Sequence, residues 1–370
     1  MDVEIVSIGD EVLQGMTVNS NAAILSFELT KRGYTVRRHI VLPDDIEMIR
    51  AGVKEAKMRS EFVIVTGGLG PTLDDLTRKA LQPFFLKKPL ELKNHVGTAT
   101  GVFGNGLVLL PGVPREMEAM FYKEALPLLQ KHFPVTKPKF TRRCTLCLLR
   151  EMEVDPWLKT MRSKEEVEIG LYPSYGSLQI VFRSSSPVDD FIEKVKERFP
   201  TFFIGDGKIE EAVHHELIAR KKTLGIAESC TGGSLAARLV AIPDASLFFS
   251  GSIVAYSNAW KERFLDVKPD TLRKNGAVSR ETVEEMVHGI FEKTDCDYAI
   301  AVSGMLGPKN SSLKPIGTVF IGVGKRNEPI DIGQILAPSD RIAGIELAAQ
   351  TALGVLWRRI VHNTMTLDLL

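Results

Sequence analysis

Apolar residues follow two alternating patterns along the first 130 residues. Largely apolar runs at residues 3–8 and 62–66 are typical of strands that are buried on both faces. Residues 20–32 and 44–56 instead repeat apolar side chains every three or four positions, as amphipathic helices do. Strands that alternate with helices predict an α/β fold with a doubly wound parallel sheet. Ligands of such sheets bind beyond the carboxyl ends of the strands.

The pattern changes near residue 133 and returns near residue 209. The stretch P-V-T-K-P-K is rich in proline and lysine and indicates a linker. Two strand-like and two helix-like runs follow it and predict a small α+β module. Strands and helices then alternate again as far as a last helix from Arg341 to Val361. We therefore expect two doubly wound α/β domains, at 1–133 and 209–365, joined by an α+β connector at 138–206.

Composition and net charge limit the classes of partner that the protein is expected to bind. The 370 residues are 44% hydrophobic and 25% charged, which is ordinary for globular proteins, and the formal net charge is +1. A charge so close to neutral makes nucleic acid or an acidic membrane an unlikely partner. The apolar runs fall short of the roughly 20 residues that span a bilayer, and the first residues lack the pattern of a signal peptide. We expect a cytoplasmic protein with no membrane partner.

Cys144 and Cys147 form a C-x-x-C spacing, which is found in zinc sites and redox pairs. The segment around them reads as an apolar strand, and no second C-x-x-C or nearby histidine pair accompanies it. We therefore interpret both cysteines as reduced residues of an ordinary strand.

The first candidate site is the segment A-E-S-C-T-G-G, where a predicted strand meets a predicted helix. Ser229 stands at this junction, beside backbone N–H groups of the helix start that can stabilise an oxyanion. Gly232 and Gly233 allow a ligand to approach the backbone. The alternative is that Ser229 or Thr231 only caps the helix. Cys230 is a rival nucleophile, although buried packing is its more common role.

A base for Ser229 is sought in the segment A-Y-S-N-A-W-K, which ends the next predicted strand. The histidines of this domain all fall in helix patterns, so a Ser/His/Asp set is not evident. A desolvated Lys261 can act as base instead, with Tyr256 relaying the proton or orienting the base. Asn258 stands between these two residues. The alternative is that Lys261 is an exposed lysine on a helix.

A third strand end, A-V-S-G-M-L-G-P, brings Ser303 and Gly304 toward the same edge of the sheet. Arg341, at the start of the last helix, can bind a phosphate through its forked guanidinium. Ordinary turns and a solvated first-turn arginine explain the same residues equally well.

The amino-terminal domain carries its own candidate site, in the loop T-G-G-L-G-P-T-L-D-D after the strand at 62–66. The loop precedes a helix, where phosphate binds readily. Its expected ligand-binding residues are Gly67, Gly68, Gly70 and Thr72. The carboxylates of Asp74 and Asp75, with Asp10 at the end of the first strand, suit Mg²⁺ or another divalent cation. Adjacent aspartates after a turn are also common helix caps.

Taken together, these segments resemble the CinA family. The carboxy-terminal motifs A-E-S-C-T-G-G, V-A-Y-S-N-x-x-K, G-A-V-S, S-G-x-x-G-P and K-P-x-G-T-V occur in the family's order over about 150 residues. The segments S-I-G-D-E-x-L, T-G-G-L-G-P-T-x-D-D and L-P-G-V-P-R-E-M resemble its amino-terminal domain, which is related to molybdopterin-binding folds. The middle module resembles the family's KH-like connector, but the G-x-x-G loop of a KH module is not evident.

The resemblance implies a nicotinamide-mononucleotide deamidase, which converts its nucleotide substrate to nicotinic acid mononucleotide and ammonia without a cofactor. In that family the residue matching Ser229 is the nucleophile, and those matching Tyr256 and Lys261 assist proton transfer. The implied substrate contacts are Thr231, Gly232, Gly233, Asn258, Ser303, Gly304 and Arg341. The resemblance also implies a homodimer, and for the amino-terminal domain an ADP-ribose pyrophosphatase that uses a divalent cation.

Several departures from the family keep other functions open. The loop after Gly307 contains Lys309 and Asn310 where glycines are usual, and Ile345 replaces a common arginine. The amino-terminal domain lacks a long helical stretch before Gly97, so we expect an open crevice there. The alternatives are a binding or scaffold protein that has lost one or both activities, and a pterin-binding amino-terminal domain.

Overall fold

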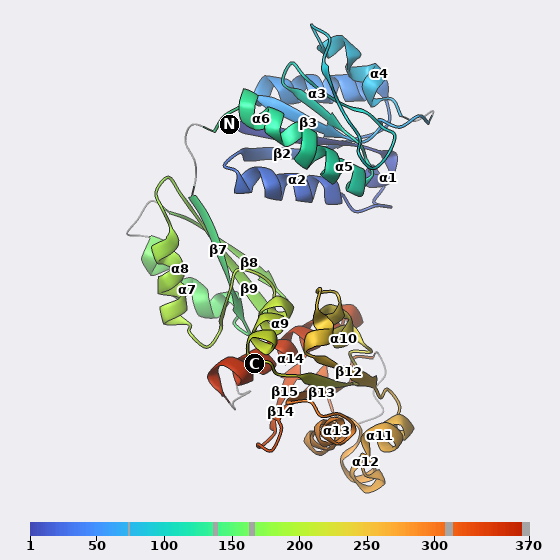
Figure 1. The fold of residues 1–370 in the computed structure, drawn as a ribbon, viewed down its shortest axis with the longest axis vertical. Coiled ribbons are helices and arrows are strands. Elements are labelled where there is room, and N and C mark those ends of the chain that lie inside the picture. The colour runs from blue at the N-terminus through green and yellow to red at the C-terminus, as the bar shows by residue number, and fades with distance from the viewer. Residues whose placement is uncertain (73–74, 136–139, 163–166, 308–313, 365–370) are drawn as a thin grey trace. The chain divides into compact units, whose positions relative to one another are not determined.

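The chain divides into two compact units, Met1–Phe140 and Thr141–Leu370, in a computed structural model (Figure 1). The structure describes residues 1–72, 75–135, 140–162, 167–307 and 314–364. Among these residues, the helices include none that is both long and apolar enough to cross a membrane.

The first unit is built on a six-stranded sheet with the strand order β2-β1-β3-β6-β5-β4. Its strands are β1 (Asp2–Ile8), β2 (Thr35–Leu42), β3 (Phe62–Thr66), β4 (Leu90–Leu92), β5 (Gly101–Gly104) and β6 (Leu107–Leu110). Its helices are α1 (Asp10–Leu13), α2 (Ser20–Lys31), α3 (Ile46–Arg59), α4 (Thr77–Leu81), α5 (Pro114–Met120) and α6 (Leu126–His132), with short turns η1 (Gln82–Phe84) and η2 (Phe121–Ala125). Strands β2, β1, β3 and β6 are parallel, whereas β5 and β4 are antiparallel additions at one edge.

Helices cover both faces of this sheet, as the alternation of strands and helices predicts (Figure 1). Leu25 of α2 and Met117 of α5 join one core, and Ile49 of α3 and Leu81 of α4 join the other. The doubly wound α/β class is therefore confirmed for this unit. The parallel strands β1, β3 and β6 direct their carboxyl ends to one edge, where the glycine-rich loop follows β3.

The second unit begins with the connector, a four-stranded sheet in the order β10-β7-β9-β8. Its elements are β7 (Phe140–Cys147), α7 (Glu151–Arg162), β8 (Glu168–Ser174), β9 (Ser177–Ser184), α8 (Asp189–Arg198) and β10 (Phe203–Gly205). Cys144 and Cys147 are free and buried in β7, as we interpreted them. Burial raises the pKa of each thiol to about 12, so neither forms a reactive thiolate near neutral pH.

The carboxy-terminal part holds a five-stranded sheet in the order β12-β11-β13-β14-β15. Its strands are β11 (Leu224–Glu228), β12 (Phe249–Val254), β13 (Tyr298–Gly304), β14 (Thr318–Lys325) and β15 (Asp331–Leu336). Its helices are α9 (Ile209–Ala219), α10 (Ser234–Val240), α11 (Asn258–Leu265), α12 (Pro269–Asn275), α13 (Arg280–Lys293) and α14 (Arg341–His362), with a short turn η3 (Ala245–Leu247). Strands β12, β11 and β13 are parallel, and β14 and β15 continue the sheet antiparallel.

Helices again cover both faces of the sheet. Leu217 of α9 and Leu353 of α14 pack on one face, and Val283 of α13 packs on the other. Ser279 caps α13 through the N–H of Thr282, at the position that the sequence predicts.

Helix α14 is buried on all sides along its second half, because the connector packs against it. Residues 351–360 of α14 are all buried. A Cβ atom at Gly354 would lie 2.9 Å from the side chain of Leu148, and one at Gly176 would lie 2.8 Å from Gln350. The connector and the carboxy-terminal sheet therefore share one apolar core through α14.

Candidate active site

Ser229 lies directly after β11, where the sequence placed it. Its N–H donates to the carbonyl of Val302 on the neighbouring strand β13 at 2.9 Å. Only 7% of the residue is exposed. This hydrogen bond to Val302 holds Ser229 at the carboxyl end of the sheet, where ligands of α/β folds bind.

Lys261 reaches this serine from α11. Its Nζ donates to Ser229 Oγ at 3.0 Å and to the carbonyl of Ala255 at 2.8 Å. The side chain is 1% exposed, so the alternative of an exposed helix lysine is wrong. Burial lowers the pKa of Lys261 from 10.5 to about 8, because an ammonium group loses its hydration there. A neutral amine is therefore accessible near physiological pH, in contact with a hydroxyl group.

The start of α10 differs from the expectation. The helix begins only at Ser234, five residues after Ser229, because Gly232 and Gly233 have positive φ angles of 59° and 101°. Its first N–H groups are also not free. The carboxylate of Glu228 accepts hydrogen bonds from the N–H groups of Gly233, Leu235 and Ala236.

Glu228 is fully buried at the end of β11, and the sequence analysis did not single it out. The only available signal was an acidic residue at the end of an apolar strand. Its occupation of the helix start leaves the N–H groups of Cys230 and Thr231 as the nearest candidates to hold an oxyanion beside Ser229.

The turn between Ser229 and α10 has an open side. A Cβ atom at Gly232 would meet no atom within 4 Å, and one at Gly233 would meet only Val254 at 3.9 Å. Space for a ligand is therefore present on this side of the turn. Thr231 is buried, and its hydroxyl has no hydrogen-bond partner among the described residues. Burial raises the pKa of Cys230 to about 12, which disfavours its thiol as the nucleophile.

Tyr256 and Arg341 contact each other at the edge of the site. Arg341 Nη2 donates to the Tyr256 hydroxyl at 2.7 Å, and Nη1 donates to the carbonyl of Leu306 at 3.4 Å. The predicted relay through the Tyr256 hydroxyl is not needed, because Lys261 contacts Ser229 directly. Asn258 is exposed at the start of α11.

Ser303 and Gly304, at the end of β13, pack beside the segment that carries Ser229. Ser303 is 1% exposed, and its hydroxyl donates to the carbonyl of Ala277 at 2.7 Å. A Cβ atom at Gly304 would lie 2.9 Å from Cys230 Sγ, so the glycine permits close packing of two strand ends. Ile345 packs against the core. Lys309 and Asn310 lie outside the described residues.

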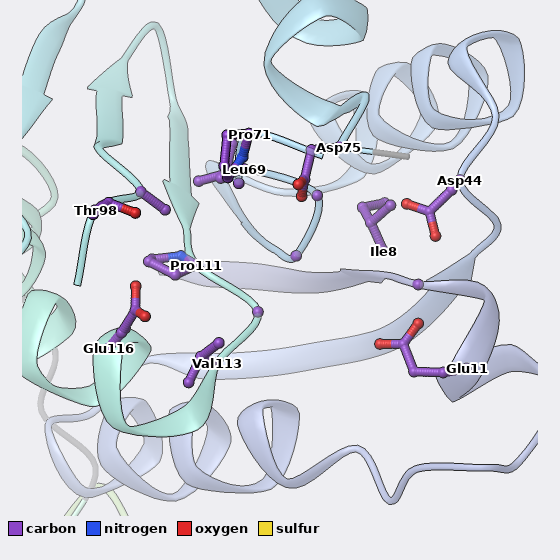
Figure 2. Close-up of a pocket in the computed structure, with 16 residues that line it drawn as sticks. Ile8, Glu11, Asp44, Leu69, Pro71, Asp75, Thr98, Pro111, Val113 and Glu116 are labelled. Carbon is purple, nitrogen blue, oxygen red and sulfur yellow. The ribbon is translucent and has the colours of Figure 1, made fainter. Parts of the chain in front are cut away.

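In the first unit, the glycine-rich loop borders a cavity of about 490 Å³ at the carboxyl edge of the sheet (Figure 2). Gly67, Gly68, Gly70 and Asp75 all line it. Figure 2 shows three further carboxylates around the cavity, those of Glu11, Asp44 and Glu116. The cavity is therefore acidic at its wall and bounded by backbone at the loop.

The cavity retains a wall despite the short segment before it. Thr98 and Ala99 line it. Asn94 holds that wall in place, because its Nδ2 donates to Glu116 Oε2 at 2.6 Å and to the carbonyl of Ala99 at 2.9 Å. The predicted open crevice is thus closed on this side by a compact loop.

Of the three predicted metal ligands, Asp75 lines the cavity in the part of the chain that the structure describes. Asp74 lies outside the described residues, and Asp10 is not among the residues that line the cavity. The Asp75 carboxylate accepts hydrogen bonds from the N–H and hydroxyl of Thr72. Burial raises the pKa of Asp75, but these bonds and one from Gly70 outweigh it and lower the pKa overall. Within the described ranges, no three His, Cys, Asp or Glu side chains are placed to hold one metal ion.

The two units and their sites define a two-part α/β protein with a serine–lysine site in its second part. The model of the CinA C-terminal domain matches residues 206–360, and a model described as "Probable molybdopterin binding domain" matches residues 4–131. The chain belongs to the CinA family.

Similar proteins span nearly the whole chain. A CinA-like protein of Thermotoga neapolitana is 35% identical over 373 residues, covering 87% of this chain and 90% of its own. A CinA-like protein of Pseudothermotoga lettingae is 35% identical over 388 residues, covering 91% and 93%. A solved CinA superfamily protein from Klebsiella pneumoniae is 35% identical with a TM-score of 0.41, covering 42% of this chain and 96% of its own.

Proposed function

We propose that the carboxy-terminal part hydrolyses the carboxamide of nicotinamide mononucleotide, giving nicotinic acid mononucleotide and ammonia. The contact between Lys261 Nζ and Ser229 Oγ at 3.0 Å carries the proposal, because it pairs a nucleophile with a base in a buried place. The order of the CinA motifs supports this substrate.

The first half of the reaction makes an acyl-enzyme. Neutral Lys261 removes the hydroxyl proton of Ser229 as Oγ adds to the carboxamide carbon. The N–H groups of Cys230 and Thr231 stabilise the negative oxygen of the tetrahedral intermediate. The C–N bond then breaks, and the Lys261 ammonium returns the proton to the departing nitrogen, which leaves as ammonia.

The second half releases the acid. Lys261 takes a proton from water as the water oxygen adds to the acyl carbon. The bond between that carbon and Ser229 Oγ breaks, and the serine oxygen recovers its proton from the lysine. Nicotinic acid mononucleotide leaves, and one water has been consumed for each ammonia formed.

Arg341 is the proposed phosphate ligand. Its guanidinium lies at the edge of the site and contacts the Tyr256 hydroxyl at 2.7 Å. A phosphate offers a guanidinium two parallel hydrogen bonds and a negative charge, which a neutral tyrosine hydroxyl does not. We therefore expect the phosphate of the substrate to displace Tyr256 from Arg341.

Ammonia release from nicotinamide mononucleotide tests the proposal. We expect the full chain to release ammonia and Ser229→Ala to lose at least about a thousandfold of this rate. Cys230→Ala is the matched control, since its buried thiol is proposed to take no part, and it should retain most of the rate. Silence of the wild type, or equal rates for wild type and Ser229→Ala, would reject the deamidase.

For the first unit, we propose that the cavity beside the Gly67–Gly70 loop binds a small ligand. Its volume of about 490 Å³ and its backbone-lined side support binding. Shifts in melting temperature with ADP-ribose, a pterin and nicotinamide mononucleotide would identify the ligand class. Cleavage of ADP-ribose with Mg²⁺ would instead favour the pyrophosphatase of the family.

The homodimer stays a prediction, which light scattering of the full chain would test.

A further inference from the structure

The carboxylate of Glu228, at the end of β11 in the second unit, accepts four hydrogen bonds. The N–H groups of Gly233, Leu235 and Ala236 donate to it at 2.9, 3.1 and 3.0 Å, and the Ser252 hydroxyl donates at 3.2 Å. The residue is 0% exposed. We infer that Glu228 is a positioning residue, which holds the nucleophile turn and the lysine-bearing segment at the distance that the reaction needs. This inference rests on the proposed function.

The arrangement differs from an ordinary helix cap. A capping side chain usually belongs to the residue directly before the helix. Here that residue is Gly233, and the carboxylate comes from the end of β11, five residues earlier. Residues 229–233 are therefore a loop whose two ends are tied together by one side chain. Ser229 is the first residue of this closed loop, so its backbone has little freedom to move.

The backbone of Glu228 ties the same loop to the segment that carries the lysine. Its carbonyl accepts the N–H of Ala255 at 2.8 Å, and the carbonyl of Ala255 accepts Lys261 Nζ at 2.8 Å. The carboxylate also reaches β12, the strand directly before Ala255, through Ser252. A closed circuit thus runs from Ser229 through its peptide bond to Glu228, and then through hydrogen bonds to Ala255, to Lys261 and back to Ser229.

Occupation of the helix start has a second effect. The N–H groups of Gly233, Leu235 and Ala236, at the start of α10, are already satisfied by the Glu228 carboxylate. A developing oxyanion is therefore directed to the N–H groups beside the nucleophile and not to the helix start. Glu228 selects where the substrate carbonyl can be stabilised without touching the substrate.

Glu228→Gln is the decisive variant, because it preserves the side-chain shape but replaces one accepting oxygen with an NH₂ group that faces N–H donors. We expect kcat to fall at least about thirtyfold while KM changes less than about threefold, since transition-state geometry is lost and ground-state binding is not. We also expect the acidic limb of the kcat–pH profile to move upward by about one pH unit, because a loosened Lys261 regains water and its pKa rises.

A lost helix cap alone would not move the pH profile. Ser279→Ala removes the buried cap of α13 and is the matched control. It should lower the melting temperature and leave the acidic limb in place. If Glu228→Gln behaves like Ser279→Ala, with stability lost but an unshifted limb and unchanged kcat, the inference is overturned.

The labelling of Ser229 by a serine-directed fluorophosphonate separates this inference from the substrate assignment. If the wild type releases no ammonia yet Ser229 is labelled, the deamidase fails but Glu228 can still be tested through the pH dependence of labelling. Should Glu228→Gln not fold, Glu228→Asp withdraws the carboxylate by one methylene and is expected to shift the limb in the same direction by less. A folded Asp variant with wild-type labelling at every pH would overturn the role.

Discussion

Two glycine pairs follow buried parallel strands in this chain, and they do different things. A Cβ atom at Gly67 would lie 2.1 Å from the carbonyl oxygen of Ile8, and one at Gly68 would lie 2.4 Å from Thr77 Oγ1. In contrast, a Cβ atom at Gly232 would meet nothing within 4 Å. The space beside Gly67 and Gly68 that a side chain would need is occupied by other atoms of the protein. The corresponding space beside Gly232 is empty and lies next to the proposed nucleophile, Ser229. A glycine-rich turn therefore indicates a tight backbone and does not by itself indicate a bound ligand.

The side chains next to the two turns also differ in their chemistry. The first turn is bordered by carboxylates that are not gathered into a metal site among the described residues. Beside the second, one buried cation contacts one hydroxyl. We therefore expect substitutions near the first turn to act on stability and those near the second to act on turnover.

The largest expected effect is that of Lys261→Met on turnover. We expect ammonia release to fall by roughly a thousandfold, because the base is removed and the volume is kept. Folding lowers the pKa of Lys261 from 10.5 to about 8, so the unfolded chain binds the proton more tightly between these pH values. The stability of the wild type relative to the variant should therefore rise from pH 8 to 10.5, by up to about 3 kcal/mol. Urea unfolding at both pH values measures it, and a parallel pH dependence in both proteins would contradict the buried amine.

The two glycine turns themselves give the next effect. Gly67→Ala should cost more than about 3 kcal/mol of unfolding free energy, because the new Cβ overlaps the Ile8 carbonyl and the φ of 106° is unfavourable. Gly232→Ala should cost only about 1 kcal/mol, which is the penalty of its φ of 59° alone. Denaturant titration of each variant measures this difference. Equal costs would remove the distinction between a filled and an open turn.

A smaller effect on kcat is expected from a change of pH. Because only the neutral form of Lys261 can accept the serine proton, kcat should rise about tenfold per pH unit below its pKa of about 8 and level off above it. Initial rates of ammonia release from pH 6 to 9.5 measure this limb. A flat profile across that range would argue that another group is the base.

The smallest effect is expected from Tyr256→Phe. The Tyr256 hydroxyl contacts Arg341, while Lys261 contacts Ser229 without it. We expect kcat to change by less than about threefold, because no proton passes through this hydroxyl. Arg341→Gln serves as its counterpart and should mainly raise KM. A loss of kcat near a hundredfold in Tyr256→Phe would restore the relay that the sequence suggested.

Much of the fold could be predicted, because the strands β1, β3, β6 and β13 are short, largely apolar runs, as expected for a buried sheet. The strands β4, β5, β8, β10 and β15 went unpredicted. They are three to seven residues long, and β4, β8, β10 and β15 lie at sheet edges, where the apolar signal is weak. The antiparallel pairing of β14 and β15 was missed with them.

The site shows a similar limit. Ser229 could be placed from its strand-to-helix junction, but the burial of Lys261 depends on packing of α11 that no local pattern reveals. Glu228 was missed because a buried acid is unusual, and its partners are backbone N–H groups that sequence does not display. Ser303 was expected in the pocket, yet its hydroxyl donates to a carbonyl of a distant turn.

Helix α14 joins two places that the linear chain keeps far apart. Its first residue, Arg341, faces Tyr256, and Gly354 in its second half is pressed against Leu148 of the connector. Its 22 residues make a rigid rod of about 33 Å. One continuous helix therefore extends from the connector to the edge of the site around Ser229, so a lengthwise shift of α14 would move the Arg341 guanidinium relative to Tyr256.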